Sequence, residues 1–313
     1  MKLVITDAKT VTQGDLSLDC LNEFADVTVY ERLLPDDYAQ ALCDADLVLC
    51  NKTIIDTAFL DAAPRLKFVG LFATGYNNVD LIETRRRGIT VCNVPSYSTM
   101  AVAQHTFAMI LHFASRVADY HEFVDNGGWK NSATFSPFVF PTHELYGKTL
   151  GIIGYGSIGQ QVGRLGEAFG MRVIAYSRHP KEGVTCVSLT DLLQEADYIT
   201  CHCPLNSESR GLIGEKELRL CKPTAIIINT ARGGIIDEHA LAAALHNGTI
   251  AGAGIDVLET EPMAQNCPLF GAKNCVMTPH IAWAPLETRI RLLDVVCDNL
   301  RAFLNGDPIH VVN

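Results

Sequence analysis

The segment at residues 149–176, TLGIIGYGSIGQQVGRLGEAFGMRVIAY, constrains the fold more than any other stretch of this chain. An apolar run is followed by Gly154, Gly156 and Gly159, then by a helix-like stretch and a second apolar run. In the G-x-G-x-x-G arrangement, the first glycine makes a tight turn, the second lets backbone amides approach a pyrophosphate, and the third allows close helix–strand packing. A tight strand–helix turn without a ligand can carry the same triplet. Because strand, triplet, helix and second strand follow in register, the segment predicts a dinucleotide site at the helix N-terminus.

The remainder of the chain repeats the alternation of short apolar runs with helical stretches. In the first 95 residues the runs are LVIT, VTVY, DLVLC, LKFVG and ITVCN, which is typical of a parallel sheet with crossover helices. One long helix is expected over about 95–120, with Ser98 or Thr99 as its N-cap, and a loop follows at 126–145. A second long helix near the C-terminus ends at Gly306. The pattern predicts an α/β protein with two doubly wound parallel-sheet domains.

Composition narrows the class of protein. The 313 residues are enough for about two domains, and 48% hydrophobic with 19% charged residues is a globular balance. The net charge of -10 argues against a nucleic-acid or anionic-membrane partner, since the longest basic run is RRR at 85–87. The sequence has neither a signal-peptide pattern nor a long uncharged apolar span, so we expect a cytoplasmic protein without a membrane segment.

The eleven cysteines are spread through apolar segments, and their odd number favours reduced thiols over a disulfide framework. The tripeptide CHC at 201–203 has the residue types of a metal site. No second Cys/His cluster with zinc-like spacing accompanies it, so we expect a structural role and no bound metal.

The residues after the second strand bear on the choice of cofactor. An Asp or Glu at this place would accept hydrogen bonds from the adenine ribose of NAD, but the chain has Ser177 and Arg178. No carboxylate then repels a 2′-phosphate, and Arg178 is able to pair with one. NADP(H) is therefore favoured, with NAD(H) still possible; in the alternative, Arg178 is a solvated loop residue.

Three polar side chains follow expected strand ends in the second domain: Arg232 in NTARGGIIDE, Glu261 in GIDVLETEP and His280 in TPHIAWA. Hydride transfer to a 2-oxo acid needs a cation for the carboxylate and a proton donor at the carbonyl oxygen. Arginine and histidine supply these, and a carboxylate beside the histidine stabilises the imidazolium. Taken singly, each has an alternative: a buried salt bridge for Arg232, a loop acid for Glu261, and a satisfied structural residue for His280.

The ordered set GYGSIG, NTARGGIIDE, GIDVLETEP and TPHIAWA resembles the D-isomer-specific 2-hydroxyacid dehydrogenases over nearly the whole chain. The resemblance implies that Arg232 binds the substrate carboxylate and carbonyl, that His280 is the general acid/base, and that Glu261 is its charge partner. The loop ATGYNNVD matches the segment that holds the substrate carboxylate through backbone amides, which implies substrate binding by Thr74 and Gly75.

The same resemblance implies a set of cofactor contacts besides the three glycines and Arg178. Ser177 departs from the family pattern, because NAD-dependent members carry Asp there, and this again favours NADP(H). The further implied contacts are Ser157, Ile158, Ser177, Pro204, Thr230 and Asp256.

The family fold implies a flavodoxin-like substrate-binding domain at residues 1–98, completed by 286–313, and a Rossmann NAD(P)-binding domain at 99–285, with an interdomain cleft. The stretches NVPSYSTMAVAQHT and HIAWA look most like glycerate dehydrogenases, also called hydroxypyruvate reductases. This implies hydride transfer between a nicotinamide cofactor and a D-2-hydroxy acid/2-oxo acid pair, with hydroxypyruvate or glyoxylate reduced, by a homodimer joined through the cofactor domains. The alternative is an NAD(H)-gated corepressor-like binding module without significant turnover.

Overall fold

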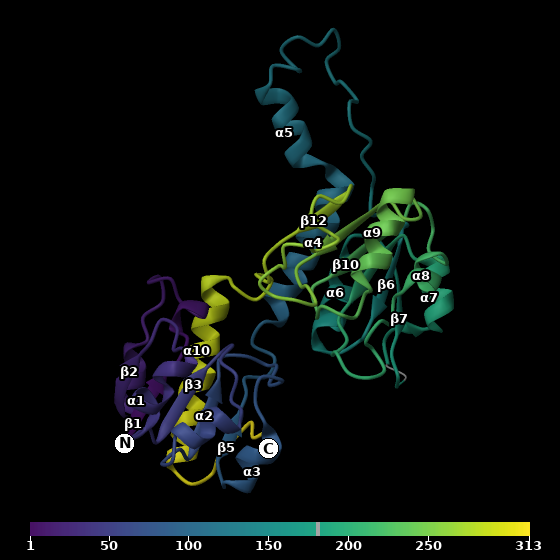
Figure 1. Cartoon of the computed structure of the whole chain (residues 1–313). Coiled ribbons are helices and arrows are strands. Elements are labelled where there is room, and N and C mark those ends of the chain that lie inside the picture. The colour runs from purple at the N-terminus through teal and green to yellow at the C-terminus, as the bar shows by residue number, and fades with distance from the viewer. Residues whose placement is uncertain (180–181) are drawn as a thin grey trace. The chain divides into compact units, whose positions relative to one another are not determined.

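A computed structural model of the chain describes residues 1–179 and 182–313. The chain divides into two compact units (Figure 1). Unit 1 comprises residues 1–98 and 284–313, and unit 2 comprises residues 99–283. The sequence had suggested divisions at 98/99 and 285/286.

Unit 1 is built on a parallel sheet of five strands in the order β2-β1-β3-β4-β5. All four residues of β3 are fully buried, as expected for a strand covered on both faces. The strands are β1 Lys2–Ile5, β2 Asp26–Val29, β3 Leu47–Cys50, β4 Phe68–Leu71 and β5 Thr90–Cys92. The helices are η1 Ala8–Thr10, η2 Asp19–Glu23, η3 Pro35–Asp37, α1 Tyr38–Leu42, α2 Thr57–Ala62, α3 Leu81–Arg86 and α10 Leu286–Leu304.

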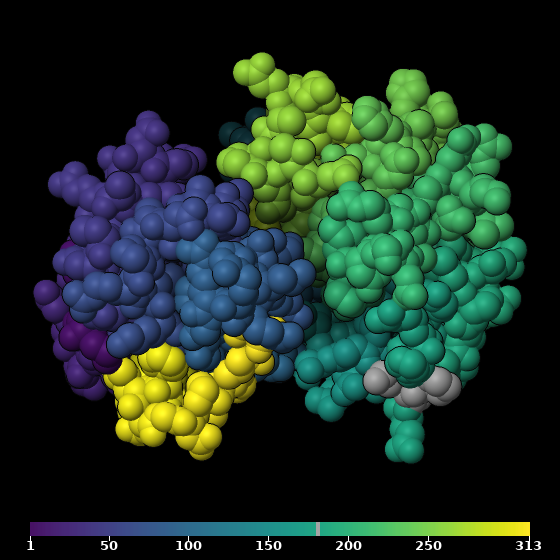
Figure 2. Space-filling model, turned by 60° about the horizontal axis from the view of Figure 1, so that its bottom comes forward, coloured from purple at the N-terminus to yellow at the C-terminus, as the bar shows by residue number. Residues whose placement is uncertain are grey.

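Residues from the C-terminal part of the chain complete unit 1. Helix α10 packs on β4, where the rings of Phe303 and Phe68 are 4.8 Å apart. Beyond α10, Val311 forms an antiparallel bridge with Cys92. In Figure 2 these residues, in yellow, lie directly against the purple and blue residues of the N-terminal stretch.

Unit 2 is built on a parallel sheet whose seven described strands have the order β12-β11-β10-β9-β6-β7-β8. The first strand of this sheet in the sequence is β6. The strands β7 and β8 lie on one side of it, and the strands from β9 to β12 lie on the other. The change of side between β6 and β9 is the topological switch point of a Rossmann fold. The strands are β6 Thr149–Ile153, β7 Arg172–Tyr176, β8 Thr185–Cys186, β9 Tyr198–Cys201, β10 Ile226–Asn229, β11 Gly252–Ile255 and β12 Cys275–Met277. The helices are α4 Thr99–Ser115, α5 Val117–Asp125, α6 Ser157–Ala168, α7 Leu189–Glu195, α8 Glu215–Leu218 and α9 Glu238–Asn247.

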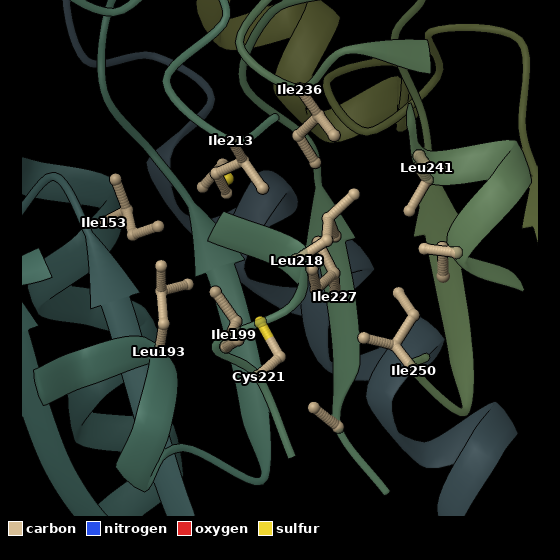
Figure 3. Packing of buried hydrophobic residues seen from close by; sticks show 14 of the residues in the cluster. Ile153, Leu193, Ile199, Ile213, Leu218, Cys221, Ile227, Ile236, Leu241 and Ile250 are labelled. Atoms are coloured by element: carbon tan, nitrogen blue, oxygen red, sulfur yellow. The ribbon is translucent and has the colours of Figure 1, made fainter. Parts of the chain in front are cut away.

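Helices cover both faces of this sheet, so its strands are apolar on both sides. On β10, Ile227 joins the core shared with α7, α8 and α9, whereas Ile226 and Ile228 join the core shared with α4 and α6. Figure 3 shows the first of these cores, to which Leu193 of α7, Ile199 of β9 and Leu241 of α9 all contribute. The predicted fold class is confirmed.

The prediction of a single long helix over about 95–120 is wrong, because two helices occupy this stretch. Helix α4 ends at Ser115, and Arg116 adopts a left-handed conformation with φ 53° before α5 begins. The Arg116 guanidinium bonds Asp119 in the first turn of α5 and lies 5.5 Å from the ring centre of Phe140. Helix α5 and the loop after it extend away from the sheet of unit 2 (Figure 1). Across the described residues, no helix is both long and apolar enough to cross a membrane.

Candidate active site

The glycine loop after β6 is shaped by contacts that exclude a side chain. Gly154 has φ +93°, and a Cβ atom there would come within 2.7 Å of the His202 carbonyl carbon and 2.6 Å of the Cys203 amide nitrogen. A Cβ at Gly159 would lie 2.2 Å from the carbonyl oxygen of Gly154. These two glycines therefore let the start of α6 pack against the ends of β6 and β9.

Gly156 has a different role, because a Cβ at this position would meet nothing within 4 Å. It is the N-cap of the twelve-residue helix α6, Ser157–Ala168, whose first two residues are Ser157 and Ile158. The open space faces the positive end of the helix dipole and the free amides of its first turn. This cradle fits the pyrophosphate of a dinucleotide.

Arg178, just beyond β7 and next to the partly buried Ser177, already has an acidic partner. Its guanidinium lies 2.6 Å from the carboxylate of Glu208, and both side chains are more than half exposed. Such an exposed pair stabilises by at most about 1 kcal/mol, so Arg178 can exchange partners readily. Glu208 could not be identified from the sequence, because thirty residues separate it from Arg178.

Two other predicted cofactor residues sit at neighbouring strand ends. The Pro204 carbonyl, which follows β9, accepts a hydrogen bond of 2.6 Å from the Ser209 hydroxyl. The buried Thr230 hydroxyl, which follows β10, lies 3.0 Å from the hydroxyl of Thr106 in α4. Both residues thus lie at the carboxyl-terminal edge of the sheet, on strands β9 and β10 to one side of the switch point.

Asp256, also predicted as a cofactor contact, organises the loop that carries His280. Its buried carboxylate accepts hydrogen bonds from the Thr278 hydroxyl at 2.6 Å and from the amides of Ile281 and Ala282 at 2.9 and 3.0 Å. Its backbone carbonyl accepts the amide of His280, which has φ 55°. The left-handed conformation of His280 is therefore fixed from both sides by one residue, Asp256, which directly follows β11.

His280 and Glu261 are brought together. The Nδ1 atom of His280 lies 2.7 Å from Oε2 of Glu261, and Oε1 of Glu261 accepts the amide of Leu258 at 3.0 Å. The two side chains are 23% and 33% exposed, so they are partly open to solvent. A carboxylate at Nδ1 orients the imidazole and leaves Nε2 for an exchange of protons.

Arg232 follows β10, the neighbour of β11, in the same sheet. Its Nη1 donates to the Ala231 carbonyl at 2.7 Å, and its own carbonyl accepts from the Asn229 side chain at 2.9 Å. Within residues 1–179 and 182–313, no carboxylate forms an ion pair with this partly buried guanidinium. The structure therefore does not support a buried salt bridge, which was the alternative for Arg232.

Thr74 and Gly75 lie in unit 1, in the loop after β4. The Thr74 hydroxyl donates to the Val94 carbonyl at 2.6 Å, and the Asn93 side chain donates to the Thr74 carbonyl at 2.8 Å. These bonds fix the loop to the segment that follows β5. Unit 1 thus carries the predicted substrate-binding residues Thr74 and Gly75, whereas unit 2 carries Arg232, Glu261 and His280.

The CHC tripeptide begins with Cys201, the last residue of β9. Cys201 is buried in the core with α7, and the ring nitrogens of His202 are enclosed without a hydrogen-bond partner. Burial lowers the pKa of His202 to about 3, so this imidazole stays neutral. Among the described residues, no group of three or more His, Cys, Asp or Glu side chains is arranged to hold a metal ion.

A Rossmann sheet with a phosphate cradle at its switch point, and a histidine–glutamate pair after neighbouring strands, defines a dinucleotide-dependent dehydrogenase. Residues 107–282 match the family described as D-isomer specific 2-hydroxyacid dehydrogenase, NAD binding domain. The chain belongs to this family.

Three proteins are similar to this chain over nearly all of its length. A hydroxypyruvate reductase of Blautia hydrogenotrophica is 40% identical, with both chains fully covered. The NADPH-dependent glyoxylate/hydroxypyruvate reductase of Sinorhizobium meliloti, solved with NADP and malonate, has a TM-score of 0.84 at 29% identity, covering 99% of this chain and 96% of its own. The D-lactate dehydrogenase of Aquifex aeolicus, solved with NAD and lactic acid, has a TM-score of 0.84 at 30% identity, covering 98% and 96%.

Proposed function

We propose that this dehydrogenase reduces a small 2-oxo acid, hydroxypyruvate or glyoxylate, to the corresponding 2-hydroxy acid, which is D-glycerate in the case of hydroxypyruvate. The observation that carries the proposal is a partly buried guanidinium, that of Arg232, without an acidic partner in the described chain. It follows β10, while Glu261 and His280 follow the neighbouring strands β11 and β12 of the same parallel sheet. A substrate carboxylate is the anion that such an arginine binds in bidentate geometry.

The chain's own residues divide the reaction between them. When bound, a reduced nicotinamide cofactor supplies the hydride. Arg232 binds the carboxylate and polarises the adjacent carbonyl, and His280 donates a proton to the carbonyl oxygen as negative charge develops there. Glu261 holds the ring by its Nδ1 atom, and Asp256 holds the loop that carries the ring. In the oxidative direction, neutral His280 accepts the hydroxyl proton.

Thr74 and Gly75 of unit 1 are proposed as further substrate-binding residues, through the backbone amides of their loop. Unit 1 is accordingly proposed as the substrate-binding domain and unit 2 as the cofactor-binding domain. The bonds that fix Thr74 to Asn93 and Val94 support a preformed loop, which loses little conformational entropy on binding an anion.

A panel of 2-oxo acids tests the proposed substrate. Hydroxypyruvate, glyoxylate, pyruvate and 2-oxoglutarate are compared with NADH and NADPH, and the handedness of the product is determined with enantiospecific reagents. The highest kcat/KM is expected for hydroxypyruvate or glyoxylate, with D-glycerate formed from hydroxypyruvate. Preference for pyruvate would overturn the substrate assignment, and cofactor binding without turnover of any acid would favour the corepressor-like alternative.

We infer that NADP(H) is the preferred cofactor. Ser177 presents no carboxylate to a 2′-phosphate, and Arg178 is held only by an exposed pair with Glu208. A phosphate with two negative charges competes well for a guanidinium whose present partner is a single exposed carboxylate. The cited reductase of Sinorhizobium meliloti, which is NADPH-dependent, offers a precedent.

A homodimer joined through unit 2 is proposed from the exposed apolar side chains of α5 and the loop after it. Phe135 and Phe138 are 90% and 92% exposed, and Val117, Val124 and Trp129 add to the same arm. So much apolar surface on one projecting segment is typical of an interface. Light scattering should give a dimer for the parent and a monomer for Phe135→Ser/Phe138→Ser.

The cytoplasm is the proposed compartment. All eleven cysteines lie within the described residues and are reduced, which suits a reducing environment.

A further inference from the structure

One side of α10 in unit 1 is joined to the N-terminal segment 11–24 by three side-chain contacts. Arg289 pairs with Asp15 through two hydrogen bonds of 2.8 and 2.6 Å, and Arg301 lies 5.4 Å from the ring centre of Phe24. Between these two contacts, Cys297 of α10 faces Cys20 of η2, with their sulfur atoms 3.5 Å apart. We refer to this set of contacts as the α10 seam.

The seam holds two thiols at a distance from which they can be joined. A disulfide requires a sulfur–sulfur distance of about 2.05 Å, so the approach needed is about 1.5 Å and lies within the range of side-chain rotation. Both residues are partly exposed, so a small oxidant can reach them. The side-chain contacts on either side hold α10 against the segment 11–24 at both ends of the thiol pair, which keeps the two cysteines facing each other.

We propose that Cys20 and Cys297 form a modification site, at which a small-molecule disulfide such as oxidised glutathione converts the dithiol to an intramolecular disulfide. The Cys297 thiol donates its hydrogen to the Cys20 sulfur, which stabilises a thiolate at Cys20 and makes Cys20 the sulfur that attacks first. Burial raises the pKa of Cys297, which agrees with this order.

The reaction proceeds in two exchanges. The Cys20 thiolate attacks one sulfur of the oxidant, whose S–S bond breaks, and the first reduced thiol leaves with the proton that Cys20 lost. Cys297 then gives up its proton to water and attacks the Cys20 sulfur of the mixed disulfide, and the second thiol leaves and takes up a proton. Two electrons pass from the two cysteines to the oxidant, which is reduced to two thiols.

The product ties α10 covalently to the segment that follows β1. Because both partners belong to unit 1, the bond is expected to raise the unfolding temperature of that unit by limiting its unfolded states, with little effect on the chemistry at His280.

Peptide mapping under non-reducing conditions tests the site on the whole protein. After treatment with oxidised glutathione, one peptide should contain residues 20 and 297 and weigh two hydrogens less than the reduced pair. The midpoint of thermal unfolding should rise by several degrees, and dithiothreitol should reverse both changes. Oxidised Cys20→Ser and Cys297→Ser should show neither change, whereas Cys43→Ser, which removes an exposed thiol elsewhere in unit 1, should behave as the parent does.

The two variants guard against a folding defect in either one. A stable adduct of glutathione on Cys20 without the linked peptide would overturn the proposal, as would an unchanged pair of free thiols. A linked peptide that also forms in Cys20→Ser would do the same, because it would assign the bond to another cysteine.

Discussion

The Nδ1 atom of His280 lies 2.7 Å from one oxygen of Glu261, and the other oxygen of Glu261 accepts the amide of Leu258. The carboxylate is therefore anchored to the backbone while it orients the ring. His280 is in turn held by a hydrogen bond from its backbone amide to the Asp256 carbonyl. The residues after two strand ends thus determine the orientation of one imidazole.

Glu261→Gln should lower kcat/KM for 2-oxo acid reduction by about tenfold or more, because the neutral amide no longer stabilises the imidazolium. Steady-state kinetics in both directions measure the effect. Glu259→Gln is the matched control, since Glu259 lies two residues away and pairs with Arg210 instead. Equal kinetics for the two variants would remove Glu261 from the proposed mechanism.

Arg232→Lys should lower kcat/KM by an amount that corresponds to about 2–4 kcal/mol of lost transition-state stabilisation. Lysine keeps the charge but loses the planar fork that binds a carboxylate. Arg219→Lys provides the control, since Arg219 is exposed and pairs only with Glu215 one turn away. Parent-like kinetics in Arg232→Lys would show that another group binds the substrate carboxylate.

The cofactor preference should respond to two substitutions beside β7. Ser177→Asp/Arg178→Ala is expected to shift the ratio of kcat/KM for NADPH over NADH by about tenfold or more toward NADH, because a new carboxylate repels the 2′-phosphate and accepts ribose hydroxyls. Glu208→Gln should shift the ratio the other way, since it releases Arg178 from its present partner. A parent enzyme that already prefers NADH would contradict the inferred cofactor.

Substitutions at Gly154 and Gly156 should affect different properties, namely the stability of unit 2 and the binding of the cofactor. Gly154→Ala is expected to destabilise unit 2 by about 1–3 kcal/mol, through its positive φ and the contact with His202. Gly156→Ala should leave the stability nearly unchanged, because the added methyl meets no protein atom within 4 Å. It should nevertheless weaken cofactor binding by about tenfold or more, since the methyl occupies the phosphate cradle. Denaturant unfolding and fluorescence titration with NADPH would distinguish the two effects.

His202 should make the protein less stable as the pH falls. Its folded-state pKa of about 3 lies below the ordinary value of 6.5, so between these values the unfolded chain holds a proton that the folded chain lacks. The free energy of unfolding then falls by up to about 1.4 kcal/mol per pH unit.

His202→Gln should flatten this dependence in urea unfolding from about pH 7.5 to about pH 5. His239→Gln, at an exposed position of α9, controls for the loss of an imidazole. Parallel slopes for His202→Gln and the parent would contradict the predicted burial of the neutral ring.

Local patterns were sufficient to predict the fold class and the position of the glycine loop. Apolar runs set the strands within one or two residues, and the triplet at 154–159 has meaning only at a strand–helix junction. The break after α4 escaped prediction, because Arg116 adopts φ 53° through contacts with Asp119 and Phe140, which no helical periodicity reveals.

For the site, the sequence pattern placed Arg232, Glu261 and His280 after strand ends. The fold shows in addition that His280 and Glu261 are in direct contact. The pairing of Arg178 with Glu208, the loop bonds of Asp256 and the contact between Cys20 and Cys297 each join residues far apart in the chain. Such contacts depend on the packed fold, and a single sequence carries no record of them.

The division of the chain also sets an order for its assembly. A growing polypeptide leaves the ribosome from its N-terminus, so unit 2 can close once residue 283 has emerged. The first 98 residues must wait for α10 and the tail, in which the Asn313 side chain bonds the Val91 amide and the Ile89 carbonyl. The nascent unit 1 therefore passes through a period in which β4 and β5 lack their covering, and chaperones would be needed most at that stage.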